Sequence, residues 1–475
     1  MNQSRPRIPR IMISGVSGGV GKSLFMTGLI VALRKQGMSV SCVVVGEALH
    51  QSLIYTRLAR RYCHTIDRAL LDTDQIISTI KRAEVGADIV IIDGAGGFYD
   101  GPEPGDEFGS DADLALLTQT PVLLVTEARR PSNSVAAVIR GFAHYSQKEI
   151  VHGVVANRLE IEEEVGPILS SPVMVTMNAC MSAYGLPPVI AGLPQASFPS
   201  QLPPSFCSQR ENLTSLPRQL FLDVANLITN HVDLSELLAI AELAPELPSV
   251  EAEPESRCNV CRIAVSDDVC FNVAYQDNFA WLMHHGAEIV PFSPLADSEL
   301  PKRIGGLYMT GGYLDSYGAE LARNERLRES ILAFAQRGGV VYSEGAGTAY
   351  LSKSYQVEPG GPTYPGVGLI PGEAVKESRP RGPLRATLIE SSVLGAPGGI
   401  ISGISLGDWA LRAGAIGAAG SVLRDLRVTV QGGMPHDEGF SHSGQSLHTF
   451  HFLHFGSNRE VARALVEAAE VGIHT

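Results

Sequence analysis

The sequence has no apolar run long enough to cross a bilayer and no excess of positive charge. A membrane-spanning helix needs about 20 consecutive apolar residues, and glycines interrupt the apolar stretch near the N-terminus after a few positions. This early interruption also argues against a signal peptide. The formal net charge is −13, so no net basic field attracts a nucleic acid backbone. The sequence predicts a cytoplasmic protein that binds neither membrane nor nucleic acid.

Cysteine is scarce. The chain has 7 cysteines in 475 residues, and an odd number spread over such a length does not indicate a disulfide framework. Cys258 and Cys261 form a C-x-x-C pair, but without a second pair or a nearby C/H partner this pattern is weak for zinc. We expect structural thiols here, with a metal or redox role as the alternative.

Short apolar runs alternate with helix-length amphipathic stretches from residue 10 to about 195. Strands separated by helices predict a parallel sheet covered on both faces. A Pro- and Ser-rich stretch and a helical pattern follow, and the alternation then restarts. Because the chain is too long for one core, the sequence predicts an α/β protein of two domains. Their expected bounds are 8–195 and 257–475, with 196–256 as a connecting segment.

The stretch "GVSGGVGKS", residues 15–23, follows an apolar strand and opens a helix. A glycine-rich turn at a helix N-terminus lets backbone N–H groups surround phosphates. The pattern therefore predicts a P-loop that binds ATP, with Gly18, Gly19 and Gly21 around the phosphates. The alternative is an ordinary strand–helix turn.

Two side chains of the same stretch have predicted roles. Lys22 should reach the β- and γ-phosphates, and the Ser23 hydroxyl should ligate Mg²⁺. Val16 stands where the usual G-x-x-x-x-G-K-[ST] pattern has its first glycine, so the motif is a variant with glycine one position earlier.

Polar residues also follow two later strands. Asp93 ends the apolar run "IVIID", where a carboxylate can hold Mg²⁺ directly or through water. Asp100 lies in the glycine-rich loop behind it, at the sheet edge where α/β proteins bind ligands; a plain turn residue is the alternative. Asn157 ends the strand of "GVVANR", and we predict that it contacts the adenine.

These stretches resemble the cobyrinate a,c-diamide synthase family. The similar blocks are "GVSGGVGKS", "IIDGAGGFYDG", "GSDADLALL", "PVLLVTEA", "GVVANR", "RIAVSDDVCFNVAYQDNFAWLMHHGAEIV", "GLYMTGGYLDSYGAELARN" and "HFLHFGSN". The resemblance implies a dethiobiotin-synthetase-like ATP domain followed by a class I glutamine amidotransferase-like domain, and a homodimer. It also implies that ATP activates carboxylates of a tetrapyrrole as acyl phosphates, which ammonia from glutamine then attacks.

The second domain departs from the family at its nucleophile. The family's turn reads roughly Y-A-E-C-G-G-L-M-Y-L, and "YSEGAGTAYL" has Gly345 at the cysteine. The closing motif H-L-H-F has Phe452 at its first histidine and His454 at its second, and His451 is one residue out of register, which on a strand points it to the opposite face. Cys270 belongs to an earlier strand region. Because glutamine hydrolysis needs a thiolate and an imidazole, we predict a domain without glutaminase activity.

The first domain departs after its second strand. The family has roughly K-V-G-P-D-Y-I-D-P there, and "VVGEALHQS" has Val44 at the lysine and Ala48 at the first aspartate. Glu47 is the only acid nearby, and it becomes a candidate metal ligand. A valine cannot stabilise charge on a transferring phosphoryl group.

A block similar to R-x-x-R-N-L-D survives partly in "RYCHTID", with Arg61, His64 and Asp67. The resemblance makes Asp67 and Asp100 candidates to face the substrate. Together with Lys22 they form the predicted catalytic set.

Histidines gather in two places. His284 and His285 lie on a predicted helix, where solvated or capping side chains are expected. The C-terminal segment contains His436, His442, His448, His451 and His454. This density suits a metal or a tetrapyrrole iron, and a loop followed by a strand is the alternative.

The sequence leads to one principal hypothesis and two alternatives. The first is ATP-dependent amidation of acetate side chains on cobyrinate or a sirohydrochlorin- or sirohaem-like tetrapyrrole. Its ammonia would come from solution or from a partner glutaminase. The second is a nucleotide-binding pseudoenzyme that acts as a tetrapyrrole carrier, chaperone or regulatory subunit, and the third is an ATPase that drives cofactor insertion.

Overall fold

The structure is a computed structural model. It describes residues 7–103, 105–129, 133–146, 149–160, 170–195, 218–251, 256–412, 423–441 and 444–471. The chain divides into two compact units, Met1–Cys207 with Ser215–Glu251 and Ser208–Thr214 with Ala252–Thr475. The part of the predicted connecting segment at 196–217 lies outside the described residues, whereas residues 218–251 belong to the first unit.

The first unit is built on a 7-stranded parallel sheet with the strand order β3-β2-β4-β1-β5-β6-β7. Its strands are β1 (Arg10–Gly15), β2 (Val40–Val45), β3 (His64–Ile66), β4 (Ile89–Gly97), β5 (Val122–Glu127), β6 (Val151–Leu159) and β7 (Val189–Pro194). Its helices are α1 (Lys22–Lys35), α2 (Leu49–Ala59), α3 (Thr73–Glu84), α4 (Asp111–Thr118), α5 (Asn133–Tyr145), α6 (Pro172–Ala183), α8 (Arg218–His231) and α9 (Leu234–Ala241).

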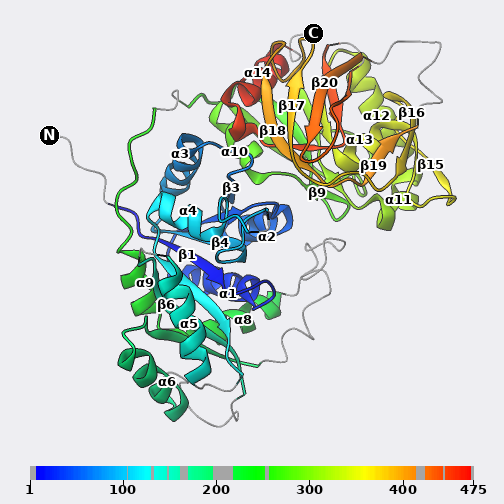
Figure 1. Ribbon diagram of the computed structural model, residues 1–475. Coiled ribbons are helices and arrows are strands. Elements are labelled where there is room, and N and C mark those ends of the chain that lie inside the picture. Colours follow the sequence, from blue (N-terminus) through cyan, green and yellow to red (C-terminus); the bar gives the residue numbers. More distant parts are fainter. Residues whose placement is uncertain are drawn as a thin grey trace. The chain divides into compact units, whose positions relative to one another are not determined.

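Helices cover both faces of this sheet, which explains why its strands read as continuous apolar runs. With right-handed crossovers, α1 and α2 lie on one face and α3, α4, α5 and α6 on the other (Figure 1). Helix α8 packs closely on α1, since a Cβ at Gly28 would lie 2.5 Å from Ile228 and 2.9 Å from Val224. The predicted parallel sheet of the α/β fold class is confirmed.

The second unit has a 10-stranded mixed sheet with the order β10-β8-β11-β13-β22-β21-β20-β17-β18-β23, and two small sheets of orders β12-β9 and β15-β14-β16-β19. The strands are β8 (Cys261–Ser266), β9 (Phe271–Val273), β10 (Ala287–Phe292), β11 (Gly306–Met309), β12 (Gly311–Gly312), β13 (Val340–Glu344), β14 (Ser352–Gln356), β15 (Thr363–Pro365), β16 (Ile370–Lys376), β17 (Gly382–Leu388), β18 (Ile400–Ser405), β19 (Trp409–Leu411), β20 (Leu423–Val430), β21 (His436–Ser441), β22 (Ser446–Thr449) and β23 (Phe452–Leu453). The helices are α10 (Gln276–His284), α11 (Leu314–Arg323), α12 (Glu325–Gln336), α13 (Gly345–Leu351) and α14 (Arg459–Val471), with a 3₁₀ turn, η5 (Phe455–Ser457).

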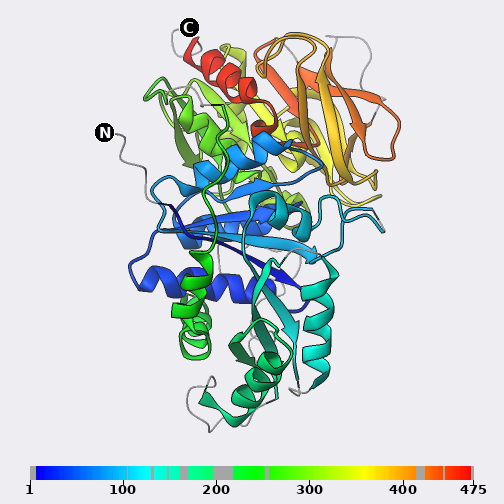
Figure 2. The same ribbon diagram turned by 60° about the vertical axis from the view of Figure 1, so that its left-hand side comes forward.

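This large sheet has two halves of different character. From β10 to β22 the neighbouring strands are parallel, and from β22 to β23 they are antiparallel. The antiparallel strands lie side by side in yellow and orange in Figure 2. Helices α10 to α13 interrupt the strands of the parallel half, whereas beyond α13 the strands follow one another as far as η5 and the C-terminal helix.

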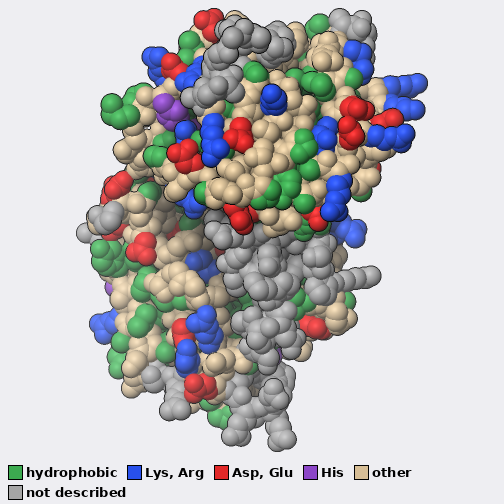
Figure 3. Space-filling view, turned by 90° about the vertical axis from the view of Figure 1, so that its right-hand side faces the viewer, with side chains coloured by type: hydrophobic (Ala, Val, Ile, Leu, Met, Phe, Trp, Pro, Cys, Tyr) green, Lys and Arg blue, Asp and Glu red, His purple; other side chains and the backbone are tan. Residues whose placement is uncertain are grey.

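Acidic and basic side chains are interspersed over the face drawn in Figure 3. Among the helices that the structure describes, none combines the length and apolarity that crossing a membrane requires.

Candidate functional site

The glycine-rich turn between β1 and α1 adopts conformations that favour glycine. Gly19 has a φ of +77° and Gly21 a φ of +101°, a region that costs other residues about 1–2 kcal/mol. Gly21 is the N-cap of α1, and no side chain in the described part of the chain caps this helix end. A helix N-terminus without a side-chain cap is suited to bind phosphate oxygens.

Lys22 begins α1 and turns towards the end of β4. It is 8% exposed, and its Nζ donates a 2.7 Å hydrogen bond to the carbonyl of Gly96. Strands β1 and β4 are parallel neighbours, with Ile13 opposite Asp93. The carboxyl ends of parallel strands meet at one edge, so Lys22 lies between the glycine-rich turn and the acidic end of β4.

Asp93 is a buried carboxylate in which only one oxygen has a hydrogen-bond partner among the described residues. Its Oδ2 accepts a 2.7 Å hydrogen bond from Tyr55 of α2, whereas Oδ1 has no partner among the described residues. Burial raises the pKa of Asp93 to about 7, and the Tyr55 hydrogen bond and the charge of Lys22 oppose this rise. Val44 of β2 is the residue in register beside Asp93. A buried polar oxygen without a partner is costly, and Oδ1 of Asp93 is therefore open to a water or a ligand.

A second buried carboxylate, Asp111, stands at the start of α4. Its Oδ2 accepts from the Ser14 hydroxyl at 2.5 Å and its Oδ1 from the N–H of Ala95 at 2.9 Å. Gly94 makes room for it, since a Cβ there would lie 2.0 Å from Asp111 Oδ2. Burial raises the pKa of Asp111 to about 6. Sequence analysis did not single out Asp111, because an acidic residue directly after the N-cap Ser110 is ordinary for a first helical turn.

The residues at this edge fit Mg²⁺ bound together with a nucleotide. Mg²⁺ is usually held by one or two carboxylates, with waters and phosphate oxygens completing its shell. No group of three or more His, Cys, Asp or Glu side chains in the described ranges could hold a metal ion by itself. The unpartnered Oδ1 of Asp93 suits a direct or water-mediated ligand, and Ser23 lies in the first turn of α1.

The end of β6 braces the glycine-rich turn. The Asn157 side chain donates a 2.7 Å hydrogen bond to the carbonyl of Val20 and accepts one from the N–H of Arg158. The Arg158 guanidinium bonds the carbonyl of Gly19 at 2.9 Å and the carboxylate of Glu127 at 2.8 Å. The predicted adenine contact of Asn157 stays a prediction. The bracing role of both residues was missed, because nothing in the sequence links "GVVANR" to the distant turn.

The other residues expected at the site are spread along the same sheet edge. Asp100 is exposed, and its carboxylate lies over Gly97, where a Cβ would be 2.1 Å from Oδ2. Asp67 follows β3, and its carboxylate accepts a 2.7 Å hydrogen bond from the N–H of Ala69, as in a local turn. In the order β3-β2-β4-β1, β3 is about 14 Å from β1. Glu47 is exposed in the loop after β2.

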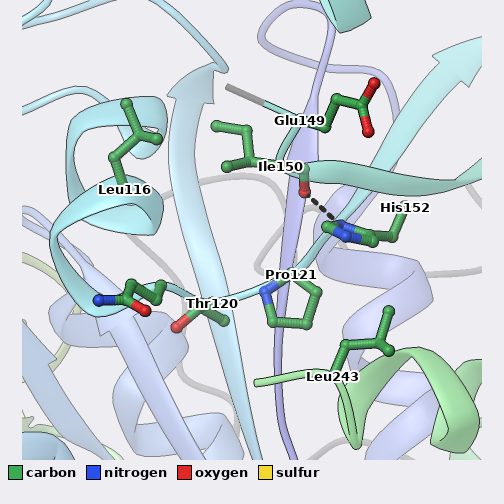
Figure 4. A pocket seen from close by; sticks show the side chains of 8 residues that line it. Leu116, Thr120, Pro121, Glu149, Ile150, His152 and Leu243 are labelled. Carbon is green, nitrogen blue, oxygen red and sulfur yellow. Dashed lines mark hydrogen bonds between the residues drawn. The ribbon is translucent and has the colours of Figure 1, made fainter. Parts of the chain in front are cut away.

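A hollow of about 420 Å³ opens at the other edge of this sheet (Figure 4). Pro121 and Ile150 line it and directly precede β5 and β6, whereas the glycine-rich turn follows the carboxyl end of β1. In Figure 4 the His152 ring turns to the carbonyl of Ile150, 2.8 Å from its Nδ1. This hollow is therefore separate from the nucleotide-type site.

In the second unit, the turn at Gly345 is a strand-to-helix elbow whose side-chain space is filled. Strand β13 ends at Glu344, α13 begins at Gly345, and Gly345 has a φ of +52°. A Cβ at Gly345 would lie 2.7 Å from Cζ and 3.2 Å from Cε2 of Phe452, and one at Gly311 would lie 2.5 Å from the same ring. The phenyl ring occupies the space that a nucleophile on this turn would need.

His454, which matches the second histidine of the closing motif, has an environment different from that of Phe452. His454 Nε2 lies 3.3 Å from Oδ2 of Asp277, and both side chains are fully buried. Its ring packs edge-on against Tyr275, with the ring centroids 4.7 Å apart. The first atoms that a Cβ at Gly345 would meet belong to Phe452, so Phe452 rather than His454 faces the elbow.

Glu344 holds the strand that carries Phe452. Its buried carboxylate accepts hydrogen bonds from the hydroxyls of Tyr342 at 2.6 Å and Tyr308 at 2.7 Å, and from the N–H of Leu453 at 2.9 Å. Burial raises the pKa of Glu344 to about 7, although these hydrogen bonds oppose the rise. The residue before the elbow thus keeps β23, and with it the phenyl ring, against the turn.

In the described part of the chain, neither the C-x-x-C pair nor the C-terminal histidines belong to a group of three or more His, Cys, Asp or Glu side chains that could hold a metal ion. Cys258 is exposed and Cys261 buried, both as free thiols, and burial raises the pKa of Cys261 to about 12. His442 lies outside the described residues. The other C-terminal histidines with polar partners contact different groups, namely Ser343 for His448, Glu438 for His451 and Asp277 for His454.

Comparison with known proteins agrees with these features. Residues 262–395 match the CobB/CobQ-like glutamine amidotransferase domain. The chain is 31% identical over 404 residues to cobyrinate a,c-diamide synthase of Listeria monocytogenes serotype 4b (strain F2365), covering 83% of this chain and 85% of that protein. The chain belongs to the cobyrinate a,c-diamide synthase family. Relatives of the same name are 32% identical in Archaeoglobus fulgidus, over 77% of each chain, and 28% identical in Dehalococcoides mccartyi (strain CBDB1), over 97% of this chain and 98% of the other.

Membership of the cobyrinate a,c-diamide synthase family confirms the resemblance drawn from the sequence. Gly345 lies inside the stretch that matches the amidotransferase domain. The elbow at Gly345 therefore belongs to a recognised domain.

Proposed function

We propose that the protein is an ATP-dependent ligase that converts acetate side chains of a tetrapyrrole to amides, using ammonia that its own second unit does not release. The observation that carries this proposal is a contrast between the two units. Lys22, Asp93 and Asp111 gather at the glycine-rich turn, whereas Phe452 fills the space in front of Gly345.

The reaction needs little covalent chemistry from the protein. A substrate carboxylate takes the γ-phosphoryl group of ATP and ADP leaves; ammonia then attacks the acyl phosphate, inorganic phosphate leaves and a proton is lost. The first-turn N–H groups of α1 and Lys22 would hold the phosphates. Asp93 and Ser23 would bind Mg²⁺, which neutralises phosphate charge when bound. Asp100, beside the turn, would meet the substrate, and Asp67 and Glu47 would act from the neighbouring loops.

The source of ammonia follows from the filled elbow. Glutamine hydrolysis passes through a thioester on a nucleophile, and Gly345 offers none. We infer that the nitrogen comes from free ammonium or from a partner glutaminase. The substrate class is cobyrinate, as the relatives' names indicate, or a sirohydrochlorin-like macrocycle. The family resemblance supports a homodimer.

One observation favours a second candidate. Val44 lies in register beside Asp93 at the position where the family pattern has lysine, and a cation there would stabilise transferring phosphoryl charge. A protein without it would bind nucleotide and tetrapyrrole as a carrier, chaperone or regulatory subunit.

The experiment is ADP release by the full chain with ATP and Mg²⁺, given ammonium or glutamine, with and without cobyrinic acid or sirohydrochlorin. Mass spectrometry of the macrocycle accompanies it. ADP release that depends on the macrocycle, together with replacement of OH by NH₂ only when ammonium is present, supports the ligase. Nucleotide binding with no mass change supports the carrier. Amidation with glutamine as the sole nitrogen source refutes the proposed loss of glutaminase activity.

A further inference from the structure

A cavity of about 350 Å³ lies in the antiparallel half of the second unit, a size in the range of small-molecule pockets. His436, Glu438 and Phe440 line it from alternate positions of β21, which share one face of a strand. Phe440 also packs edge-on against Phe450, with the ring centroids 5.7 Å apart. The lining of the cavity thus combines aromatic rings with polar side chains.

The acidic groups at this cavity are already paired. The Glu438 carboxylate accepts hydrogen bonds from the Thr449 hydroxyl at 3.0 Å and the N–H of Phe450 at 2.7 Å, and lies 3.1 Å from Nε2 of His451. Asp437 binds Arg427 through both of its oxygens, at 2.9 and 3.4 Å. Because both carboxylates already have partners, neither needs a cationic group of a ligand to balance it.

The basic groups at the cavity can still form hydrogen bonds with a ligand. Nε2 of His436 is buried without a hydrogen-bond partner in the part of the chain that the structure describes. A carboxylate oxygen of Glu377 lies 3.9 Å from Nε of Arg379, which is beyond hydrogen-bond distance. Arg424, also at the lining, bonds the backbone carbonyl of Asp437 at 3.2 Å. The polar side of the cavity therefore offers unsatisfied donors and positive charge.

We propose that this cavity binds a small organic anion whose carboxylate meets Arg379 and His436 and whose flat apolar body lies on Phe440 and Phe450. Guanidinium groups pair strongly with carboxylates, and a buried imidazole nitrogen without a partner is satisfied by the same oxygens. His451 keeps its place through Glu438. Burial lowers the pKa of His451, against the charge of Glu438, and the charges of His436 and Arg379 lower it further.

This site is distinct from the elbow. Phe452 contacts Gly345 and Gly311, whereas the preceding residue, His451, lines the cavity. The residues that line the cavity do not include Phe452, Gly345 or Gly311, so the two sites are separate. Its ligand is not glutamine bound for hydrolysis.

The test uses the full-length protein and 3-phenylpropionate as the probe, with 3-phenylpropanamide as its uncharged counterpart. Binding is measured by calorimetry and by the ¹³C-methyl resonance of Met434, an 85% exposed residue of the lining, which M434L identifies. The acid should bind at least about 10-fold more tightly than the amide, the difference that one charge-assisted contact makes, and should shift the Met434 signal.

The variants locate the anion. R379Q and H436Q should each weaken binding of the acid by about 10-fold. R381Q is the matched control, because Arg381 lies two positions away and pairs with Asp408 at the surface; it should bind like the wild type. Equal binding of acid and amide, unchanged binding by R379Q, or no Met434 shift with the acid would overturn the proposal. An equal Met434 shift with inorganic phosphate would overturn the inference that an apolar body of the ligand lies on Phe440 and Phe450.

Discussion

Replacing Gly345 with cysteine should lower the stability of the protein without creating a glutaminase. The added Cβ would lie 2.7 Å from Cζ of Phe452, well inside van der Waals contact, and overpacking of this kind costs about 1–3 kcal/mol. Gly345 also has a φ of +52°, where a side chain costs about 1–2 kcal/mol. The free energy of unfolding should therefore fall by about 2–5 kcal/mol.

The steric part of this loss should depend on the ring at Phe452. In the G345C/F452H protein the larger ring is gone, so the combined loss should be smaller than the sum of the single losses by about 1–2 kcal/mol. G345A is the matched control, since it adds the same Cβ without a thiol and should lose nearly as much as G345C. Urea unfolding of the full chain gives the stabilities, and glutamate release from glutamine gives the activity.

Two results would refute this reasoning. Strictly additive losses in the double substitution would mean that the phenyl ring does not oppose a side chain at Gly345. Glutamate release by G345C alone would mean that the Phe452 ring moves aside and leaves room for a functional nucleophile. Glutamate release only by G345C/F452H would show that the rest of the site is intact.

Three further outcomes are expected. K22A should lower ADP release by about 10²–10³-fold, the effect of removing one preorganised donor of positive charge, whereas K35A, at the far end of α1, should leave it unchanged; similar losses would refute the phosphate role. Y55F should raise the Mg²⁺ concentration for half-maximal ADP release by about 10-fold or more, since Tyr55 orients Asp93, and an unchanged requirement would contradict this. Because burial raises the pKa of Glu344 from 4.5 to about 7, the folded state holds a proton that the unfolded state releases, and stability should fall by about 3 kcal/mol as pH rises from 4.5 to above 7. Urea unfolding across this range should show a flatter profile for E344Q, and an equally steep one would exclude Glu344 as the cause.

The parts of the fold that follow from local patterns were predictable. Apolar runs alternating with amphipathic stretches predicted the parallel sheet, and the glycines of residues 15–23 predicted the turn in which Gly19 and Gly21 have positive φ. The antiparallel strands after α13 were not predicted, because the α/β alternation was expected to continue to near the end of the chain, although apolar and polar residues alternate at 384–388 and 426–430 as a half-buried strand requires.

The residues that complete the site were harder to predict from the sequence. Tyr55 bonds Asp93 across 38 positions of sequence, and it lies in a helix with no motif around it. The adenine contact of Asn157 stays a prediction, and its hydrogen bond to the carbonyl of Val20 was not anticipated. Such long-range side-chain contacts depend on strand order and register, which a single sequence does not specify. The same limit applies to Glu438 and the cavity in the second unit.

The contact between Phe452 and Gly345 also bears on how easily a nucleophile could arise at this elbow. A lineage that had lost only the thiol could regain it through one codon change. Once a phenyl ring had filled the vacated volume, restoring the cysteine alone would introduce a clash, and restoring the imidazole alone would leave no nucleophile. If the second unit lacks glutaminase activity as proposed, gaining it would require two replacements of which neither is useful first, so packing alone would keep the elbow without a nucleophile.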